Sequence, residues 1–267
     1  MRVNNNMSST LKQMVHWRVV AASVCGTSHV KNEQLCQDAH NWQVLPDNIL
    51  VAAVADGAGS ARLGKVGSMI ATTAAVESVR EHEISRRALS SDDFVRSLLT
   101  NAMVAAKKAV EEEAEATSSP YDDLATTLIV MVATPEGVAV AQIGDGVAVA
   151  RDYQGNLLAL TMPDSGEYIN ETTFLTSFDS IDNAQLRLWR QPIVNVGVLT
   201  DGLQMLAINM AVGAPHKPFF FPLFEFVANI DDKSVAKEQL VKFLRSERIT
   251  QRTDDDLTLV LAALHEQ

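Results

Sequence analysis

The stretch Ile49-Leu50-Val51-Ala52-Ala53-Val54-Ala55-Asp56-Gly57-Ala58-Gly59-Ser60 contains seven apolar residues that run directly into an Asp-Gly pair. The apolar run has the length and the β-branched content of a strand buried on both faces, although periodicity alone leaves a buried helical segment open. Asp-Gly is a turn-forming pair and ends the strand. The carboxylate of Asp56 is therefore expected at the rim of a core strand, where its burial is costly unless a partner such as a divalent cation compensates it.

The same arrangement recurs along the chain. Asp145, Asp201 and the acidic run 254–256 each lie at the end of an apolar, strand-like segment. A single Asp-Gly pair is most often only a turn, so the repetition is the informative feature. If these strands are neighbours in one core, their ends converge, and converging carboxylates stay ionised together only with hard cations between them. The sequence therefore favours a site for divalent cations.

Composition restricts the class of protein. The chain has 267 residues, of which 47% are hydrophobic, and this length suits one large domain or two small ones. Its net charge of −11 argues against nucleic acid or an anionic membrane as the main partner. The longest apolar run falls well short of the ~18 residues that a membrane-spanning helix needs.

The polar residues 1–14 are expected to form a disordered leader. They contain no apolar signal-peptide region, which favours a cytoplasmic protein. Cys25 and Cys36 are the only cysteines, and no spacing around them indicates a disulfide framework or a zinc site. Two reduced thiols are therefore expected.

The order of the expected elements indicates an α+β fold. Strand-like segments come in runs, separated by two helices expected at about 65–83 and 92–116, rather than in the βαβα alternation of a parallel sheet. Short turns, including the one at 145–146, predict antiparallel hairpins between the strands that they join. With no repeat and no linker in the sequence, residues 15–267 are expected to form a single domain.

Two segments are harder to assign. Residues 162–190 are polar and weakly periodic, and their length favours a functional flap over an ordinary loop. The segment 213–222 is rich in Pro and Phe and is expected to pack as a loop, followed by a last helix near 235–245.

The order of Asp38, Asp56, Asp145, Asp201 and Asp255 resembles that of the metal-dependent protein phosphatases, the protein phosphatase 2C-like family. The strings Gly-Thr-Ser-His at 26–29, Cys-Gln-Asp-Ala at 36–39 and Arg-Thr-Asp-Asp-Asp at 252–256 are similar to its bacterial branch, typified by protein phosphatase C of enterobacteria. The resemblance spans about 17–264. It implies a four-layer α-β-β-α sandwich of two antiparallel sheets flanked by helix pairs, with two or three Mn²⁺ or Mg²⁺ ions at one end.

The resemblance also implies roles for individual residues. Asp56 corresponds to the carboxylate that bridges two metals, with the carbonyl oxygen of Gly57 as a further ligand. Asp201 and Asp255 correspond to ligands of the first metal, and Asp38 to an acidic residue that acts on the second metal largely through water. These four aspartates are the expected catalytic residues.

Asp145 corresponds to a residue that, together with Asp201, can hold a third metal. The alternative is purely structural, because Gly144-Asp145-Gly146 also suits a tight turn between two strands.

The sequence departs from the family pattern at two positions. The family usually has Glu-Asp where this chain has Gln37-Asp38, and it tends to carry a phosphate-binding Arg where this chain has Glu33. The nearest cations are Lys31 and His29, either of which is a candidate for binding the substrate phosphate. Lys offers a point charge in place of the bidentate fork of Arg, and the alternative for Lys31 is a solvated loop cation.

The predicted function is hydrolysis of phosphoserine and phosphothreonine in phosphorylated proteins by a metal-activated water, in opposition to a serine/threonine kinase. Oxygen-only ligands suit Mn²⁺ or Mg²⁺. Two alternatives remain open at this point: a pseudophosphatase that binds phosphoproteins without turnover, and a phosphatase of small phosphate esters.

Overall fold

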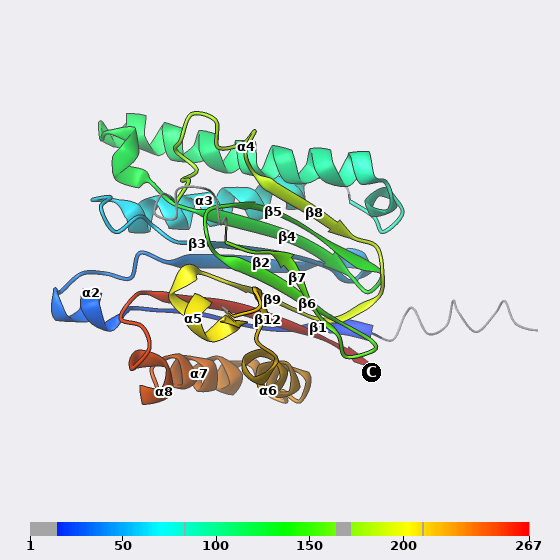
Figure 1. Cartoon of the computed structure of the whole chain (residues 1–267). Helices are drawn as coiled ribbons and strands as arrows, with labels where there is room; N and C mark the ends of the chain where they lie inside the picture. Colours follow the sequence, from blue (N-terminus) through cyan, green and yellow to red (C-terminus); the bar gives the residue numbers. More distant parts are fainter. Residues whose placement is uncertain (1–14, 83, 164–171, 210, 267) are drawn as a thin grey trace, which may run out of the picture.

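The computed structural model describes residues 15–82, 84–163, 172–209 and 211–266. Two antiparallel sheets stack face to face, α3 and α4 cover the outer face of one sheet, and α6 and α7 cover the outer face of the other (Figure 1). This arrangement confirms the predicted α+β fold with four layers. The polar leader expected at 1–14 lies outside the described residues.

The first sheet has the strand order β1-β12-β9-β6-β7. Its register places Val24 opposite Leu257 and Leu259 opposite Leu199. The end of β1, the start of β12 and the end of β9 therefore lie at the same end of the sheet. The strands are β1 (Val15–Val24), β6 (Val147–Asp152), β7 (Leu157–Thr161), β9 (Ile193–Leu199) and β12 (Leu257–Glu266).

The second sheet has the strand order β2-β3-β4-β5-β8. Ala39 pairs with Ala55, so β2 begins where β3 ends. The strands are β2 (Ala39–Leu45), β3 (Ile49–Ala55), β4 (Leu128–Thr134), β5 (Gly137–Ile143) and β8 (Gln185–Trp189).

The apolar run that opens the sequence analysis is β3, and every residue in it is buried. Successive side chains of a strand point to opposite faces, and here each face has its own core. Val51 and Ala53 pack in the core beneath α3 and α4, whereas Leu50 and Val54 pack in the core between the two sheets. A strand with both faces buried has no need for polar residues, which explains its uninterrupted apolar sequence.

The first helical layer consists of α3 (Gly64–Glu81) and α4 (Asp92–Thr117). Ser91 caps α4 by accepting a hydrogen bond from the backbone N–H of Phe94, and two aspartates in the first turn complement the helix dipole. The helix ends at Thr117, and the residue that follows, Ser118, has a left-handed φ of 53°.

The remaining elements are short or belong to the second helical layer. They are α2 (Thr27–Lys31), α5 (Gln204–Ala207), α6 (Lys217–Ala228), α7 (Lys233–Leu244), α8 (Glu247–Thr250), the strand pair β10 (Ile208–Asn209) and β11 (Ala214–Pro215), and 3₁₀ turns at Pro46–Asn48, Ala88–Ser90, Tyr121–Leu124 and Asp201–Leu203.

The prediction of a loop at 213–222 is wrong in its second half, where α6 begins at Lys217. Pro218 lies in the first turn of α6, where the missing N–H has no helical partner to lose. The buried side chains of α6 recur with helical spacing, which outweighs the cost of Pro222 inside the helix. They are Phe219, Phe220, Leu223, Phe224 and Val227.

The predicted hairpin at 145–146 is also wrong, because β5 and β6 belong to different sheets. The chain crosses from one sheet to the other at Gly144–Gly146. Gly144 has a φ of +102°, and a Cβ there would lie 2.5 Å from the side chain of Thr127, so the crossing requires glycine. A short connection cannot by itself distinguish a hairpin from a crossing between stacked sheets.

The polar excursion at 162–190 is more ordered than predicted at its end. Residues 164–171 lie outside the described residues, but Gln185–Trp189 form β8 and pair with β5 at the edge of the second sheet. Within the described part of the chain, no helix combines the length and the apolar character that crossing a membrane requires.

Candidate metal centre

One end of the sandwich collects the aspartates that the sequence singled out. Asp56 follows β3, Asp201 follows β9, Asp38 directly precedes β2, Asp255 lies two residues before β12, and Asp145 lies in the crossing between the sheets. In an antiparallel sheet the end of one strand adjoins the start of its neighbour, so these positions lie at the same end of the strands. This is the end at which α2 and α5 lie (Figure 1, left).

The backbone of Asp56 is fixed by two threonines at the start of β4. Its N–H donates to Thr127 Oγ1 at 2.9 Å, and its carbonyl oxygen accepts from Thr126 Oγ1 at 2.9 Å. The next residue, Gly57, approaches Gly64 so closely that a Cβ would lie 2.4 Å from the Gly64 backbone. Only glycine fits here, and the close approach brings the start of α3 against this end of the sandwich.

Asp38 lies opposite Asp56 across the β2–β3 pair and is 6% exposed. Its Oδ2 accepts a hydrogen bond from Thr200 Oγ1 at 2.7 Å, and Thr200 Oγ1 in turn accepts from the backbone N–H of Thr258 at 3.0 Å. The second oxygen, Oδ1, is buried without a hydrogen-bond partner among the described residues. Thr200 thus ties Asp38 of one sheet to β9 and β12 of the other.

Asp145 shows the same half-satisfied state. Its Oδ2 accepts from Thr172 Oγ1 at 2.7 Å, and its Oδ1 is buried without a hydrogen-bond partner in the described structure. Because a buried carboxylate oxygen without a donor is costly, both Asp38 and Asp145 offer an oxygen that a cation would stabilise.

The electrostatics show that the carboxylates act as one group, the acidic cluster of Asp38, Asp56, Asp145, Asp201 and Asp255. Burial is the largest cause that raises the pKa of Asp38 to about 7 and that of Asp201 to about 6, and it also raises the pKa of Asp56 well above its usual value and that of Asp255. Charge repulsion adds to burial: Asp38 and Asp201 raise the pKa of Asp56, and Asp145 and Asp255 raise that of Asp201.

The residues of the acidic cluster fit divalent cations. Their donors are all carboxylate oxygens, which hard ions such as Mn²⁺ and Mg²⁺ prefer. Among the described residues, no Lys or Arg forms an ion pair with any of the five carboxylates. A cation is the one partner that both relieves their mutual repulsion and engages the unpartnered oxygens of Asp38 and Asp145.

The two candidate phosphate-binding residues lie on α2. Lys31 ends the helix and is exposed. His29 faces inward instead, and its Nδ1 lies 3.0 Å from Asp256 Oδ2. Glu33, which stands where the family tends to have Arg, is exposed and has a φ of 55°.

Sequence reasoning missed Asp256, which is 2% exposed and does not join the acidic cluster. Its Oδ1 accepts from the backbone N–H of Gly26 at 2.6 Å and its Oδ2 from that of Gln37 at 2.5 Å. Asp256 therefore fastens both ends of the 26–37 segment to the start of β12. The available signal was its position directly before a strand, where neighbouring residues face opposite sides, so Asp255 and Asp256 cannot share one role.

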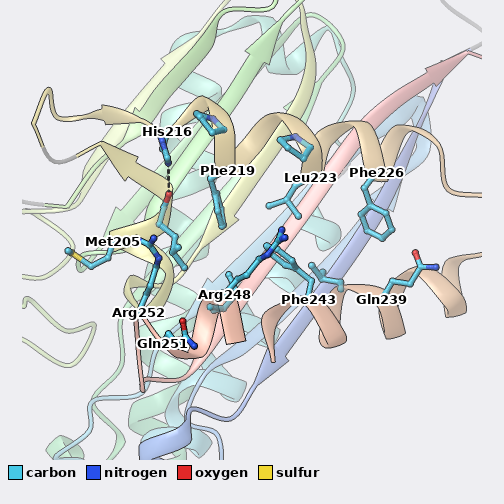
Figure 2. Close-up of a pocket in the computed structure, with 15 residues that line it drawn as sticks. Met205, His216, Phe219, Leu223, Phe226, Gln239, Phe243, Arg248, Gln251 and Arg252 are labelled. Carbon is cyan, nitrogen blue, oxygen red and sulfur yellow. Dashed lines mark hydrogen bonds between the residues drawn. The ribbon is translucent and has the colours of Figure 1, made fainter. Parts of the chain in front are cut away.

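A cavity of about 710 Å³ lies elsewhere, between α5, α6, α7 and α8 (Figure 2). Apolar and aromatic side chains such as Phe219, Leu223 and Phe243 line it, together with Arg248 and Arg252. His216 Nδ1 lies 3.2 Å from the carbonyl oxygen of Leu206 at its edge. No carboxylate and none of the predicted site residues lines this cavity, so the acidic cluster remains the chemical centre.

Sequence comparison finds known proteins that match most of the chain. The family model for protein phosphatase 2C matches residues 25–245. Serine/threonine-protein phosphatase 3 of Escherichia coli K12 is 37% identical over 252 residues, which cover 92% of this chain and 98% of that protein.

Two solved structures show the same fold at low sequence identity. The serine/threonine phosphatase of S. agalactiae has a TM-score of 0.65 at 15% identity, with 93% of this chain and 99% of that chain covered. The catalytic domain of the serine threonine protein phosphatase PstP, in complex with two manganese ions, has a TM-score of 0.61 at 16% identity, with 94% and 100% covered.

Proposed function

The chain belongs to the protein phosphatase 2C family and is a serine/threonine protein phosphatase, and we propose that its acidic cluster holds the divalent ions on which turnover depends. The observation that carries this proposal is the convergence of five carboxylates at one end of the sandwich. Burial raises the pKa of four of them, Asp38, Asp56, Asp201 and Asp255, and repulsion from neighbouring carboxylates adds to that rise for Asp56 and Asp201. No described Lys or Arg forms an ion pair with them, and their oxygens suit hard cations.

Within the cluster we propose that Asp56 would be shared by two ions, with the carbonyl oxygen of Gly57 as a further ligand. Asp201 and Asp255 would hold the first ion, and Asp38 would act at the second. When bound, the ions would lower the pKa of a water molecule and offset the charge on the phosphoryl oxygens. Thr200 orients Asp38, and Thr126 and Thr127 orient the Asp56 backbone, so the carboxylates are fixed before substrate arrives.

We propose Mn²⁺ or Mg²⁺ as the ions, two of them bound tightly and a third held by Asp145 and Asp201. The support for the third ion is the charge effect of Asp145 on the pKa of Asp201, together with the buried, unpartnered oxygen of Asp145. The carboxylates of Asp145 and Asp201 repel each other when both are ionised, and a cation between them would remove that repulsion.

The substrate phosphate is proposed to contact α2. Lys31 is exposed and carries a charge that a phosphate dianion attracts. His29 is the second candidate, through the part of its ring that does not face Asp256. The proposed substrates are phosphoserine and phosphothreonine in proteins of the cytoplasm, which places the enzyme opposite a serine/threonine kinase.

The decisive experiment is a phosphopeptide assay on protein treated with a chelator and then supplied with one metal at a time. Activity should vanish after chelation and return with Mn²⁺ or Mg²⁺ but not with Zn²⁺. Full activity after exhaustive chelation would overturn the proposal. Stoichiometric metal binding without turnover of any phosphopeptide would instead identify a phosphoprotein-binding pseudophosphatase, the reading that the neutral Gln37 and the missing Arg favour.

A further inference from the structure

A second group of metal-binding side chains lies next to the acidic cluster and differs from it in chemistry. Cys25 follows β1, His29 lies in α2, and Asp256 precedes β12. The register of β1 and β12 places Val24 opposite Leu257, which brings the residues just beyond these two strand ends together. One ligand atom from each of the three side chains lies within 4.8 Å of the other two.

The three side chains offer sulfur, nitrogen and oxygen rather than oxygen alone. This donor set suits Zn²⁺, which binds Cys, His and carboxylate ligands, and it suits Mn²⁺ and Mg²⁺ poorly. Zn²⁺ sites with three protein ligands leave a fourth position to water. The partial exposure of Cys25 and His29 leaves solvent access for that water.

Asp256 is oriented as a ligand by its surroundings. The backbone N–H groups of Gly26 and Gln37 each occupy one lone pair of a different carboxylate oxygen and fix the plane of the group. Each oxygen retains a second lone pair for a cation. Such outer hydrogen bonds hold ligating carboxylates in place in metal sites.

His29 supplies the second sign of a site. Its Nδ1 lies 3.0 Å from Asp256 Oδ2, but the two atoms are not aligned for a hydrogen bond, and Nδ1 is buried without a hydrogen-bond partner among the described residues. A ring nitrogen and a carboxylate oxygen that are close but unaligned can both direct a lone pair at a shared ion once the nitrogen is unprotonated.

We propose that Cys25, His29 and Asp256 form a Zn²⁺ site separate from the acidic cluster. As the Sγ–Zn bond forms, the Cys25 thiol gives its proton to solvent, because the thiolate is the ligand. The sequence could not reveal this site through spacing, since Asp256 is distant from Cys25 and His29 in the chain. The inference concerns binding alone and holds whether or not the chain turns over phosphopeptides.

The test uses Co²⁺ as a spectroscopic substitute for Zn²⁺ in full-length protein whose acidic cluster is first saturated with Mn²⁺. Binding at the proposed site should produce a thiolate-to-cobalt charge-transfer absorption that one equivalent of Zn²⁺ abolishes. Cys25→Ser should lose this absorption and bind Zn²⁺ at least about 10-fold more weakly. Cys36→Ser is the matched control and should keep both.

Circular dichroism and Mn²⁺-dependent activity verify that each variant is folded, since neither cysteine belongs to the acidic cluster. The proposal is overturned if the native protein gives no thiolate absorption, if Cys25→Ser retains it, or if Cys36→Ser is the variant that loses it. Because absorption and Zn²⁺ affinity are read without substrate, failure here is distinguishable from failure of the phosphatase assignment.

Discussion

Asp255 and Asp256 are adjacent in the chain, yet they belong to two clusters with opposite electrostatic character. Asp255 is exposed as a whole residue, yet partial desolvation of its carboxylate and the charge of Asp256 raise its pKa. Asp256 is buried, but two backbone N–H groups and the His29 ring surround it. Burial alone therefore does not make a carboxylate dependent on metal; what matters is whether donors are supplied by the protein.

The acidic cluster has too few hydrogen-bond donors to satisfy its carboxylate oxygens. Asp38 and Asp145 each receive one hydroxyl and keep one buried oxygen unpartnered among the described residues. The protein thus holds mutually repelling carboxylates together in the metal-free state, and cation binding at the acidic cluster would stabilise it. Asp256 differs, because its contacts fasten α2 and the segment before β2 to β12 even before any ion binds.

The largest expected effect comes from removing the charge at the centre of the acidic cluster. Asp56→Asn preserves shape and the backbone contacts with Thr126 and Thr127 but removes the charge that would be shared by two ions. Turnover at saturating Mn²⁺ should fall at least about 100-fold, the upper end of the loss seen when a mere supporting residue of a metal site is changed.

The matched control for Asp56→Asn is Asp254→Asn, an exposed member of the acidic run whose backbone oxygen, not its side chain, contacts Ser28. It should retain native turnover. If Asp56→Asn keeps more than half of the native rate while remaining folded, Asp56 does not bridge the ions.

The contrast between the clusters also predicts how pH affects the metal-free protein. Burial raises the folded-state pKa of Asp38 to about 7 and of Asp201 to about 6, above the unfolded value of about 4. The folded state therefore binds more protons between these values, so this contribution to stability is present at low pH and is lost as pH rises through 6 to 7. Partly buried His40, whose pKa is lowered to about 4 mainly by desolvation, acts in the opposite direction.

Comparison with Asp38→Asn separates the two effects. Between pH 5.5 and 7.5 the metal-free native protein should lose about 2 kcal/mol more unfolding free energy than metal-free Asp38→Asn, a figure that follows from the pKa shift of one carboxyl. Urea denaturation at both pH values measures it. Identical pH dependence in the two proteins would show that Asp38 is ionised in the metal-free state.

Asp145 tests how far the acidic cluster extends. Asp145→Asn keeps a hydrogen-bonding group for Thr172 and leaves Asp56, Asp201 and Asp255 in place, so the two tighter ions should remain. Turnover should fall about 10-fold, the lower end of the cost for a residue near a metal, and the Mn²⁺ concentration for half activity should change. Titration calorimetry should count one ion fewer.

Asp152→Asn is the comparison variant for Asp145→Asn, because Asp152 is an aspartate beside the exposed turn at 152–156 and serves only that turn. It should match the native protein in ion count and in rate. Asp145 is only a connecting residue if its own variant does the same.

The sequence could predict those site residues that lie at the ends of apolar strands. Asp56 follows a fully buried strand, and the repetition of that pattern at Asp145 and Asp201 was enough to expect convergence. The α+β class followed from the order of strands and helices, whereas the two-sheet sandwich was implied by the family resemblance alone. Local pattern and global fold agree at these positions, which is why they could be recognised.

What sequence could not supply depends on long-range placement. The turn at Gly144–Gly146 has the residues of a hairpin, and only the stacking of two sheets makes it a crossing. The division of labour between Asp255 and Asp256 depends on which of them faces Gly26 and Gln37, over 200 residues away in the chain. The start of α6 was missed because its two prolines predicted a loop. The helical spacing of its apolar side chains becomes decisive only when they pack against the sheet.

The smallest expected effect concerns Lys31, the exposed last residue of α2. The contacts of Asp256 hold α2 in place, and α2 carries Lys31 at the same end of the molecule as the acidic cluster. A phosphate contact through Lys31 would therefore depend on the Asp256 contacts, although Lys31 takes no part in them. Lys31→Ala removes an exposed ammonium that is proposed to contact the ground-state phosphate, and the loss of such a contact raises KM more than it lowers kcat. An exposed charge contact is worth at most about 1 kcal/mol, which corresponds to an increase in KM of about threefold to fivefold that weakens at high salt. Lys108→Ala on α4, where the ammonium pairs with Glu112 on the outer helical layer, is the control and should leave KM unchanged. If KM is unchanged in both Lys31→Ala and His29→Ala, the residue that replaces the missing Arg lies outside α2.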